Sequence, residues 1–161
     1  MDKINRLHML PLTLPSFDYK TKQVLNKAYI LDPVRKKYVL LTPEEWVRQH
    51  MLHYLIHHCG YPKGLCCLEK RIYGGKRYYR PDIICCDTLG TAKMVVECKA
   101  PYITLTNATL GQMMQYNRQL AVMHLVVTNG NNHFCWQWEA ASRQFQAISY
   151  IPTYDACRPT H

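Results

Sequence analysis

The residues best suited to chemistry in this sequence are two carboxylates and one amine: Asp82, Glu97 and Lys99. Glu97 and Lys99 are two positions apart in a strand-like segment, so both side chains point to the same face of that strand. If Asp82 lies opposite Glu97 on a neighbouring strand, their Cβ atoms are about 4.5–5.5 Å apart and the two charges repel each other. A divalent cation bound by their oxygens would relieve this repulsion. The sequence therefore predicts a metal site formed by Asp82 and Glu97, with the Lys99 ammonium beside it.

The segments that must position these residues have the pattern of one β-hairpin. Residues 80–87 and residues 93–99 have the composition of strands, and residues 88–91 supply the turn, in which Gly90 can adopt a positive φ. Closing this turn over two residues or over four gives the same pairing register. In either case Asp82 is placed directly opposite its partner carboxylate.

Composition limits the classes of protein to which the chain can belong. Its 161 residues are 48% hydrophobic, which suits a single domain with a core and argues against wholesale disorder. No window of 18 uninterrupted apolar residues occurs, and the N-terminus lacks the apolar stretch of a secretory signal. We therefore expect no membrane span and a cytoplasmic location. The formal net charge of +9 predisposes the chain to bind polyanions such as DNA.

The positive charge is concentrated in two segments, residues 20–37 and residues 70–80. The second segment also contains three tyrosines and leads directly into Asp82. Basic and aromatic side chains interleaved beside an acidic pocket suit contact with a nucleic-acid backbone. Charge alone leaves open the alternative of a solvated basic hairpin.

Cysteines and histidines suggest other chemistry, but in weaker patterns. The eight cysteines include no CxxC pair, so we expect small buried side chains in a reducing compartment rather than zinc ligands. His50, His53, His57 and His58 fall on a predicted helix, where a zinc or haem patch is conceivable. No carboxylate or thiol completes such a ligand set, and a mixed interfacial face is the preferred interpretation. A small zinc-binding protein is nevertheless one competing class.

The elements before the hairpin are an arm, two strands and a helix. Residues 1–26 are predicted to form an N-terminal arm and residues 27–161 a single domain. Strands are expected at 27–31 and 37–41. The helix begins after the N-cap Thr42, with Pro43 in its first position and Glu45 closing a capping box. Its apolar stripe is Val47, Met51, Leu52, Leu55 and Ile56.

The elements around and after the hairpin complete a mixed sheet with helices packed against it. The sequence predicts a strand at 65–73, a turn at Gly74-Gly75, a second helix at 109–122 with a capping box of Thr109 and Gln112, and strands at 123–128, 133–139 and 144–150.

Two motifs resemble known nucleases. Pro81-Asp82, then fourteen residues, then Glu97-Cys98-Lys99 resembles the PD-(D/E)xK nuclease superfamily. Gln112-Met-Met-Gln-Tyr116 resembles the QxxxY motif of the nuclease domain in type I restriction enzyme R subunits. The flanking motifs, which extend this second resemblance over residues 27–135, are those at 41–49, 61–62, 97–101 and 127–130, together with Asn117.

The resemblance implies a restriction-endonuclease-like α/β fold with an αβββαβ core, a mixed central sheet flanked by helices, and extra hairpins at the N- and C-terminal ends. It implies that Asp82 and Glu97 bind Mg²⁺ or Mn²⁺ and that Lys99, with a lowered pKa, orients or deprotonates the attacking water or stabilises the transition state. Glu45 matches the helix glutamate that supplements the metal site, although the adjacent Glu44 is an alternative.

The resemblance also implies supporting roles for four further residues. Gln112 and Tyr116, one helical turn apart, would place DNA or support the metal shell. Glu69 is expected to face the same pocket or to be a surface strand residue, and Arg80 to contact a phosphate or a site carboxylate. The expected function is a Mg²⁺-dependent DNA endonuclease in restriction or related DNA processing.

The competing interpretation is a non-cleaving DNA-binding module of the same fold. Because the sequence contains no helicase motor of the kind that follows this domain in R subunits, we expect a helicase, translocase or specificity subunit as partner. A homodimer is a further expectation, since cutting both strands generally needs two such sites.

Overall fold

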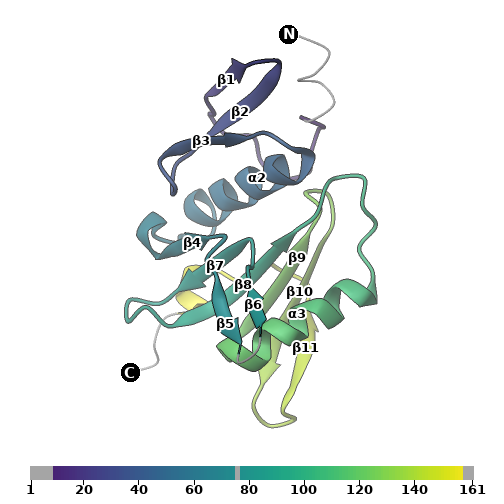
Figure 1. Ribbon diagram of the computed structural model, residues 1–161. Coiled ribbons are helices and arrows are strands. Elements are labelled where there is room, and N and C mark those ends of the chain that lie inside the picture. Colours follow the sequence, from purple (N-terminus) through teal and green to yellow (C-terminus); the bar gives the residue numbers. More distant parts are fainter. Residues whose placement is uncertain (1–8, 75–76, 158–161) are drawn as a thin grey trace.

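The computed structural model describes residues 9–74 and 77–157 (Figure 1). Its strands are β1 (Thr21–Val24), β2 (Lys27–Asp32), β3 (Lys37–Leu40), β4 (Cys66–Leu68), β5 (Ile72–Gly74), β6 (Arg77–Tyr79), β7 (Ile83–Cys86), β8 (Ala92–Cys98), β9 (His124–Thr128), β10 (His133–Glu139) and β11 (Gln144–Ile148). Its α-helices are α2 (Pro43–His57) and α3 (Asn107–Leu120), and two short 3-10 segments are η1 (Lys63–Leu65) and η2 (Tyr154–Cys157).

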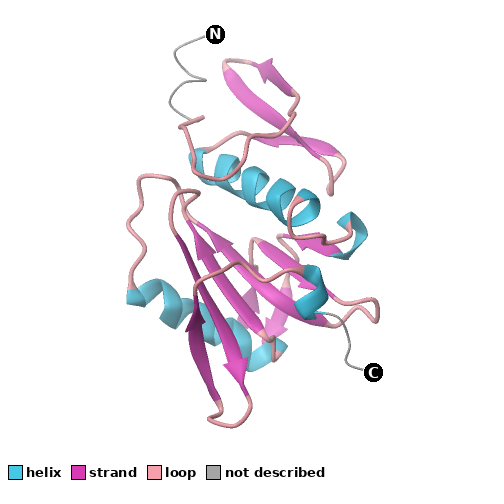
Figure 2. Ribbon diagram, turned by 180° about the vertical axis from the view of Figure 1, so that it is seen from behind, coloured by secondary structure: helices cyan, strands magenta, loops and turns pink. Residues whose placement is uncertain are grey.

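The larger sheet has six strands in the order β11-β10-β9-β8-β7-β4. Neighbouring strands are antiparallel except β8 and β9, which are parallel and are joined through α3. Buried side chains of α2 pack on one face of this sheet, and buried side chains of α3 pack on the other. Figure 2 shows the sheet from behind, with α3 on its far side. The order α2-β4-β7-β8-α3-β9 confirms the predicted mixed α/β fold with an αβββαβ core.

The helix α2 is buried because it lies between two sheets (Figure 1). Val47, Met51, Leu52 and Leu55 of the predicted stripe are fully buried against the larger sheet. Trp46, on another side of the helix, packs against the smaller sheet β1-β2-β3. A helix covered on two sides has few exposed positions, and its polar residues at 45 and 48–50 are therefore buried as well.

The start of α2 follows the prediction in part. The Glu45 backbone N–H donates to the Thr42 side-chain oxygen at 3.0 Å, so Thr42 is the N-cap. The predicted reciprocal bond of a capping box is replaced, because the Glu45 carboxylate accepts from Arg35, Arg48 and Gln49.

Two other predicted boundaries were wrong. α3 begins at Asn107 after the N-cap Thr106, two residues before the predicted start, and Thr106 makes no side-chain cap. The predicted strand at 65–73 is divided between β4 and β5, which belong to different sheets. Glu69 lies at the break with φ +47°. A positive φ is unfavourable in an extended strand, so the chain turns at this residue.

The predicted register of the β7-β8 hairpin is present, although its turn closes differently. Asp87 N–H donates to Thr91 O at 2.9 Å, leaving a three-residue loop instead of the predicted two or four. Cys85 pairs with Met94 and Cys86 with Ala92, so Lys93 is the extra residue of a β-bulge. The bulge offsets the odd loop length, and Ile83 pairs with Val96 as predicted.

The N-terminal arm is more ordered than predicted in its last residues. Thr21–Val24 form β1, which pairs with β2, and β2 pairs with β3. Leu14 is buried in the core beside α2. Residues 1–8 of the arm, and the Gly75 half of the predicted Gly74-Gly75 turn, lie outside the described residues.

Candidate functional site

The hairpin brings Asp82, Glu97 and Lys99 together at one end of the larger sheet. Continuing the register of β7 and β8 by one residue sets Asp82 across from Glu97. The Cys98 N–H donates to Asp82 Oδ2 at 2.7 Å, which ties Asp82 to the edge of β8. Lys99, just after β8, is paired with Glu97 at 3.0 Å between Nζ and Oε1. The side chains predicted to share a face therefore do so.

Glu97 is the least satisfied carboxylate of this site. It is 7% exposed, and its Oε2 is buried without a hydrogen-bond partner. Burial, and next the negative charge of Asp82, raise the pKa of Glu97 to about 7, although Lys99 acts in the opposite direction. A cation that contacts this free oxygen would stabilise the charged form of the Glu97 carboxylate.

The Lys99 ammonium is held in its charged form. Burial acts to lower the pKa of Lys99, but the neighbouring carboxylates, Glu97 foremost, outweigh this effect and the pKa is raised. The pKa of Lys99 is thus raised, whereas the sequence allowed for a lowered pKa in a lysine that is buried or next to a metal. The side chain is a cation and a hydrogen-bond donor to Glu97.

Arg48 lies on the other side of Asp82. Its Nε donates to Asp82 Oδ1 at 3.0 Å, a second guanidinium nitrogen donates to the same oxygen, and the third donates to Glu45 Oε2. The Arg48 side chain is only 6% exposed. Glu44 at 3.4 Å and Glu69 at 3.7 Å are further ion-pair partners of Arg48. Burial, the largest single influence, lowers the pKa of Arg48, but the carboxylates, Asp82 first and then Glu45, outweigh it and the pKa is raised. Arg48 thus neutralises two buried acids and fixes the orientation of Asp82.

A second arginine extends this network. Arg35 contacts Asp32 at 2.8 Å, Glu45 at 2.6 Å and Glu69 at 2.7 Å. Gln49 Nε2 donates to Asp32 Oδ2 at 2.7 Å and to Glu45 Oε1 at 2.9 Å. We call the following set the arginine cluster: Asp32, Arg35, Glu45, Arg48, Gln49 and Glu69.

Neither arginine was predicted from the sequence. A signal existed for Arg48, which follows Glu44 by four residues and Glu45 by three and therefore shares a helix face with both. Arg35 lies in the turn between two strands, and no local pattern connects it with Glu45 or Glu69.

The two adjacent helix glutamates both contact Arg48, but their other surroundings differ, because consecutive residues point about 100° apart around a helix. Glu45 is 5% exposed and belongs to the arginine cluster. The side chain of Glu44 is 46% exposed, and burial followed by the charge of Asp82 raises its pKa. Glu44 also acts on the pKa values of Glu97 and Lys99. The structure therefore places Glu44, the alternative that the sequence left open, beside the catalytic candidates. We call the following set the open group: Glu44, Asp82, Glu97 and Lys99.

Glu69 and Arg80 lie at the rim of the site. Arg80 donates to Glu69 Oε1 at 2.8 Å, and Glu69 also accepts from Arg35. Arg80 is 54% exposed, so its pairing with a carboxylate leaves much of the guanidinium in solvent.

Gln112 and Tyr116 are one turn apart on α3, on the opposite face of the sheet from α2. Gln112 is exposed, and the side chain of Tyr116 lies outside what the structure describes. Their supporting role stays a prediction.

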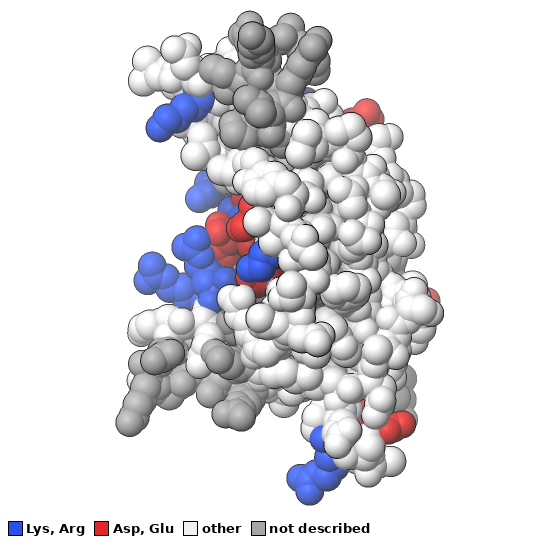
Figure 3. Space-filling model, turned by 90° about the vertical axis from the view of Figure 1, so that its right-hand side faces the viewer, with Lys and Arg blue, Asp and Glu red and all other residues white. Residues whose placement is uncertain are grey.

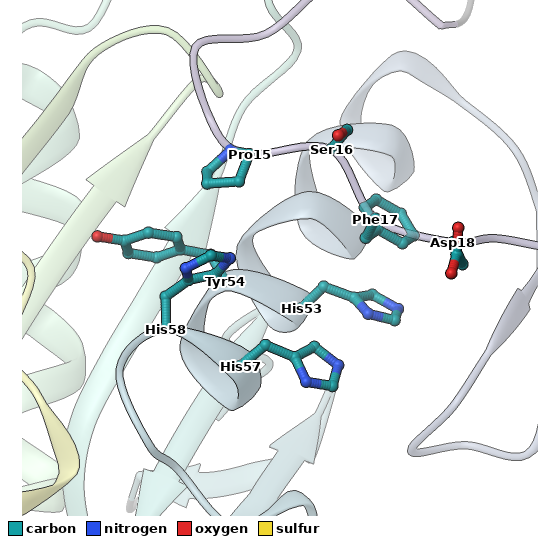
Figure 4. Close-up of a pocket in the computed structure, with 8 residues that line it drawn as sticks. All are labelled: Pro15, Ser16, Phe17, Asp18, His53, Tyr54, His57 and His58. Atoms are coloured by element: carbon teal, nitrogen blue, oxygen red, sulfur yellow. The ribbon is translucent and has the colours of Figure 1, made fainter.

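The helix histidines pack against the N-terminal arm. The His53 ring stacks on Phe17 with 4.0 Å between centroids, and His57 follows at 5.5 Å from His53. His50 Nδ1 lies 3.2 Å from Pro15 O. Figure 4 shows Phe17, His53 and His57 on one side of a pocket of about 290 Å³. Within residues 9–74 and 77–157, no group of three or more His, Cys, Asp or Glu side chains is arranged to hold a metal ion.

The surface at the site is accessible. Figure 3 shows acidic side chains gathered in a hollow with Lys and Arg side chains beside them. A groove of about 470 Å³ opens next to Glu44 and Lys99 and is bordered by Thr42, Tyr102 and Ile103. The open group is therefore accessible through this groove, at the N-terminal end of α2.

Residues 43–152, which include α2, the hairpin and α3, match the sequence family described as the type I restriction enzyme R protein N terminus. The chain belongs to this family. The structure is similar to a solved fragment from Vibrio vulnificus YJ016 that is described as an HsdR subunit of a type I restriction enzyme. The sequence identity between this chain and that fragment is 19%, and the TM-score is 0.45. The similarity covers 62% of this chain and 21% of that chain, so the matched region spans about a fifth of the solved fragment.

No curated protein matches the chain in sequence. None of the helices in the described parts of the chain is long and apolar enough to span a membrane.

Proposed function

We propose that this R-protein N-terminal domain is a Mg²⁺- or Mn²⁺-dependent DNA endonuclease of the PD-(D/E)xK type that acts in restriction. Membership of the family supports a role in a restriction system. The observation that carries the nuclease proposal is the open group: Glu97 presents a buried, unpartnered oxygen beside Asp82, with the Lys99 ammonium 3.0 Å from its other oxygen.

The donor set fits a small, oxygen-binding cation. Mg²⁺ is usually held by one or two carboxylates together with waters and substrate phosphate, and it does not need a cage formed by the protein alone. Glu97 Oε2 is free to bind, and Asp82 Oδ2 has a second acceptor position besides the one used by the Cys98 N–H. Asp82 and Glu97 would hold the ion, and Glu44 would support it, in the role that the sequence assigned to Glu45 with Glu44 as the alternative.

When bound, the ion would supply an acidified water and offset charge on the phosphate. The side chains of the chain itself would do the positioning. Lys99 is a charged donor that can orient a water or stabilise an anionic phosphate oxygen. Arg48 holds Asp82 in one orientation and compensates part of its charge. The groove beside Glu44 and Lys99 would receive the DNA backbone.

Plasmid nicking tests this proposal. We expect the native chain to nick supercoiled DNA with Mg²⁺ or Mn²⁺, and Glu97→Gln and Lys99→Met each to lower the rate by at least about 100-fold. Glu139→Gln, an exposed glutamate at the end of β10, is the matched control and should nick at the native rate. Equal rates for Glu97→Gln and Glu139→Gln would contradict the assignment of the site.

A second candidate function is a DNA-binding module that does not cleave. The pairing of Arg48 with Asp82 favours it, because a guanidinium already occupies one carboxylate oxygen. Salt-sensitive DNA binding without nicking under either metal would support this alternative. In both cases we propose DNA, a helicase or translocase and a specificity subunit as partners. Light scattering with and without DNA would test the homodimer.

A further inference from the structure

The hairpin formed by β5 and β6 has one inward and one outward face. Ile72 pairs with Tyr79, and Tyr73 pairs with Tyr78. Ile72 and Tyr79 pack against the core on the α3 side of the larger sheet, whereas Tyr73 and Tyr78 are 64% and 69% exposed. Figure 1 shows this hairpin beside α3, in front of the larger sheet. The inward pair anchors the hairpin and the outward pair faces solvent.

The two exposed tyrosines already form a surface together. Their ring centroids are 5.2 Å apart and their planes are inclined by 53°. Aromatic side chains directly opposite each other on paired strands stabilise the hairpin, so this arrangement exists before any ligand binds. Two large aromatic rings exposed together are a surface on which a flat, apolar ring can stack.

The charge around the tyrosine pair favours a nucleic-acid ligand over a protein. Residues 70–80 contain five basic residues and no acidic one. Lys70, Arg71 and Arg80 are exposed. Tyr73, Lys70 and Arg71 also line a groove of about 340 Å³ whose other walls include the apolar side chains of Ile84 and Leu120. A groove with aromatic and apolar walls and a basic edge suits a nucleotide, whose base is flat and whose phosphate is anionic.

The tyrosine pair lies within reach of the open group. The hairpin is joined at its base by the ion pair of Glu69 and Arg80, and Asp82 follows Arg80 by two residues. Asp82 follows Tyr78 by four positions, which places their Cα atoms at most about 14 Å apart. Since one DNA strand advances about 3.4 Å per nucleotide, this distance corresponds to about four nucleotides.

We propose that Tyr73 and Tyr78 form a stacking platform for an unpaired base, with Lys70 and Arg71 contacting the adjacent phosphates. A base in a duplex is already stacked on its neighbours, so the platform selects DNA that is single-stranded near it. As a statement about binding, this inference stands alone. As a statement about which substrate is cut, it rests on the proposed nuclease function, and places the unpaired base within about four nucleotides of the cleaved phosphate.

Oligonucleotide binding in EDTA tests the platform separately from cleavage. Fluorescence anisotropy would compare one labelled strand, alone and in a duplex, with the native chain and with Tyr73→Leu/Tyr78→Leu. We expect the double variant to bind the single strand about 5- to 100-fold more weakly, with a much smaller change for the duplex. Tyr73→Phe/Tyr78→Phe keeps both rings and should retain native affinity. Tyr150→Leu removes an exposed tyrosine elsewhere and should have no effect.

A second measurement does not depend on the folding of a variant. A strand containing 2-aminopurine should lose fluorescence on binding the native chain, because stacking on tyrosine quenches this base. Equal single-strand affinities for the native chain and a folded leucine variant, or no quenching at any position of the base, would overturn the platform even if plasmid nicking occurred. Stacking without nicking in Mg²⁺ or Mn²⁺ would leave the platform in place and refute the nuclease. If the tyrosine pair bound a protein partner instead, the native chain and the leucine variant would have equal affinities for the single strand.

Discussion

Two neighbouring groups of charged side chains, the arginine cluster and the open group, meet where Asp82 of the open group accepts from Arg48, and they differ in how completely their carboxylates are paired. On one side, in the arginine cluster, each of the four carboxylate oxygens of Asp32 and Glu45 accepts a hydrogen bond from Arg35, Arg48 or a neighbouring donor. On the other side, the open group has a buried oxygen on Glu97 without a partner. Asp32, Glu45, Asp82 and Glu97 are all buried, and among these four carboxylates only Glu97 has an oxygen that is buried without a hydrogen-bond partner. The buried side-chain atom without a partner in the arginine cluster is the amide oxygen of Gln49, which carries no charge.

This difference separates a structural role from a ligand-binding one. A buried ion pair with full hydrogen bonding fixes the orientation of its members and is costly to break. A buried carboxylate without a donor is unfavourable in the folded protein by itself and becomes favourable when a cation binds. The arginine cluster therefore holds the end of α2 and the hairpin in register, and the open group is where a cation and a phosphate are expected.

The largest contrast is expected from removing one cation from each group. Arg48→Met should lower the free energy of unfolding by about 3–5 kcal/mol, because it leaves Asp82 and Glu45 buried without their shared partner. Lys99→Met should lower it by less than Arg48→Met does, since Lys99 is partly exposed and has one ion-pair partner, and since Glu97, whose pKa is already raised, can take up a proton when that partner is lost. Urea unfolding in EDTA measures the free energy of unfolding of both variants. Similar losses for the two variants would show that the groups do not differ as described.

Divalent metal should stabilise the protein through one group alone. Mg²⁺ or Ca²⁺ at 10 to 100 times its dissociation constant should raise the free energy of unfolding by about 1.4–2.7 kcal/mol. Glu97→Gln should lose this increment, whereas Glu45→Gln should keep it even though its own stability is lower. Thermal melts with and without metal provide the comparison, and an increment lost in Glu45→Gln but kept in Glu97→Gln would reverse the assignment of the two groups.

The pH dependence of stability should show the uncompensated charge of Glu97. The folded state raises the pKa of Glu97 from its ordinary value of 4.5 to about 7, mainly through burial. Protonated Glu97 therefore favours the folded state fully below about pH 4.5, and this contribution is lost as the pH rises through about 7. In EDTA, the native chain should lose stability relative to Glu97→Gln across this window.

The difference between native and Glu97→Gln unfolding curves is the informative quantity. Burial, followed by the charges of His57 and His50, lowers the pKa of His53 to about 4, which gives both proteins an opposite slope that cancels in the subtraction. A flat difference between pH 4.5 and 7 would mean that Glu97 is not buried without compensation.

The smallest effect is expected at the rim. Arg80→Ala removes an ion pair with Glu69 in which the arginine is 54% exposed, so the free energy of unfolding should fall by no more than about 1 kcal/mol. A loss as large as that of Arg48→Met would extend the arginine cluster to Arg80. Chemical denaturation at two salt concentrations measures the contribution of this ion pair, because the attraction between exposed charges is screened by salt.

Much of the scaffold follows from local sequence signals. Thr42 and Pro43 specify the start of α2, and the alternation of residues in β7 and β8 specifies which side chains share a face. The one-residue error in the turn was harmless, because the bulge at Lys93 restores the register. Boundaries that depend on packing were less accurate: the positive φ of Glu69 divides a segment that the sequence presents as one strand.

The sequence by itself determined which residues come together at the candidate site. The spacing of Asp82, Glu97 and Lys99 on two adjacent strands brings them to one place, because strand geometry has a fixed period and antiparallel pairing has a fixed register.

Only the tertiary structure decided how their charges are compensated. Arg35 and Arg48 come from a distant turn and from a helix that packs across the hairpin, and their reach depends on that packing. The same packing directs the Glu45 side chain into the arginine cluster and leaves the Glu44 side chain in the open group. The electrostatic state of a carboxylate depends on every buried partner within a few ångströms, and such partners are set by three-dimensional contacts rather than by spacing along the chain.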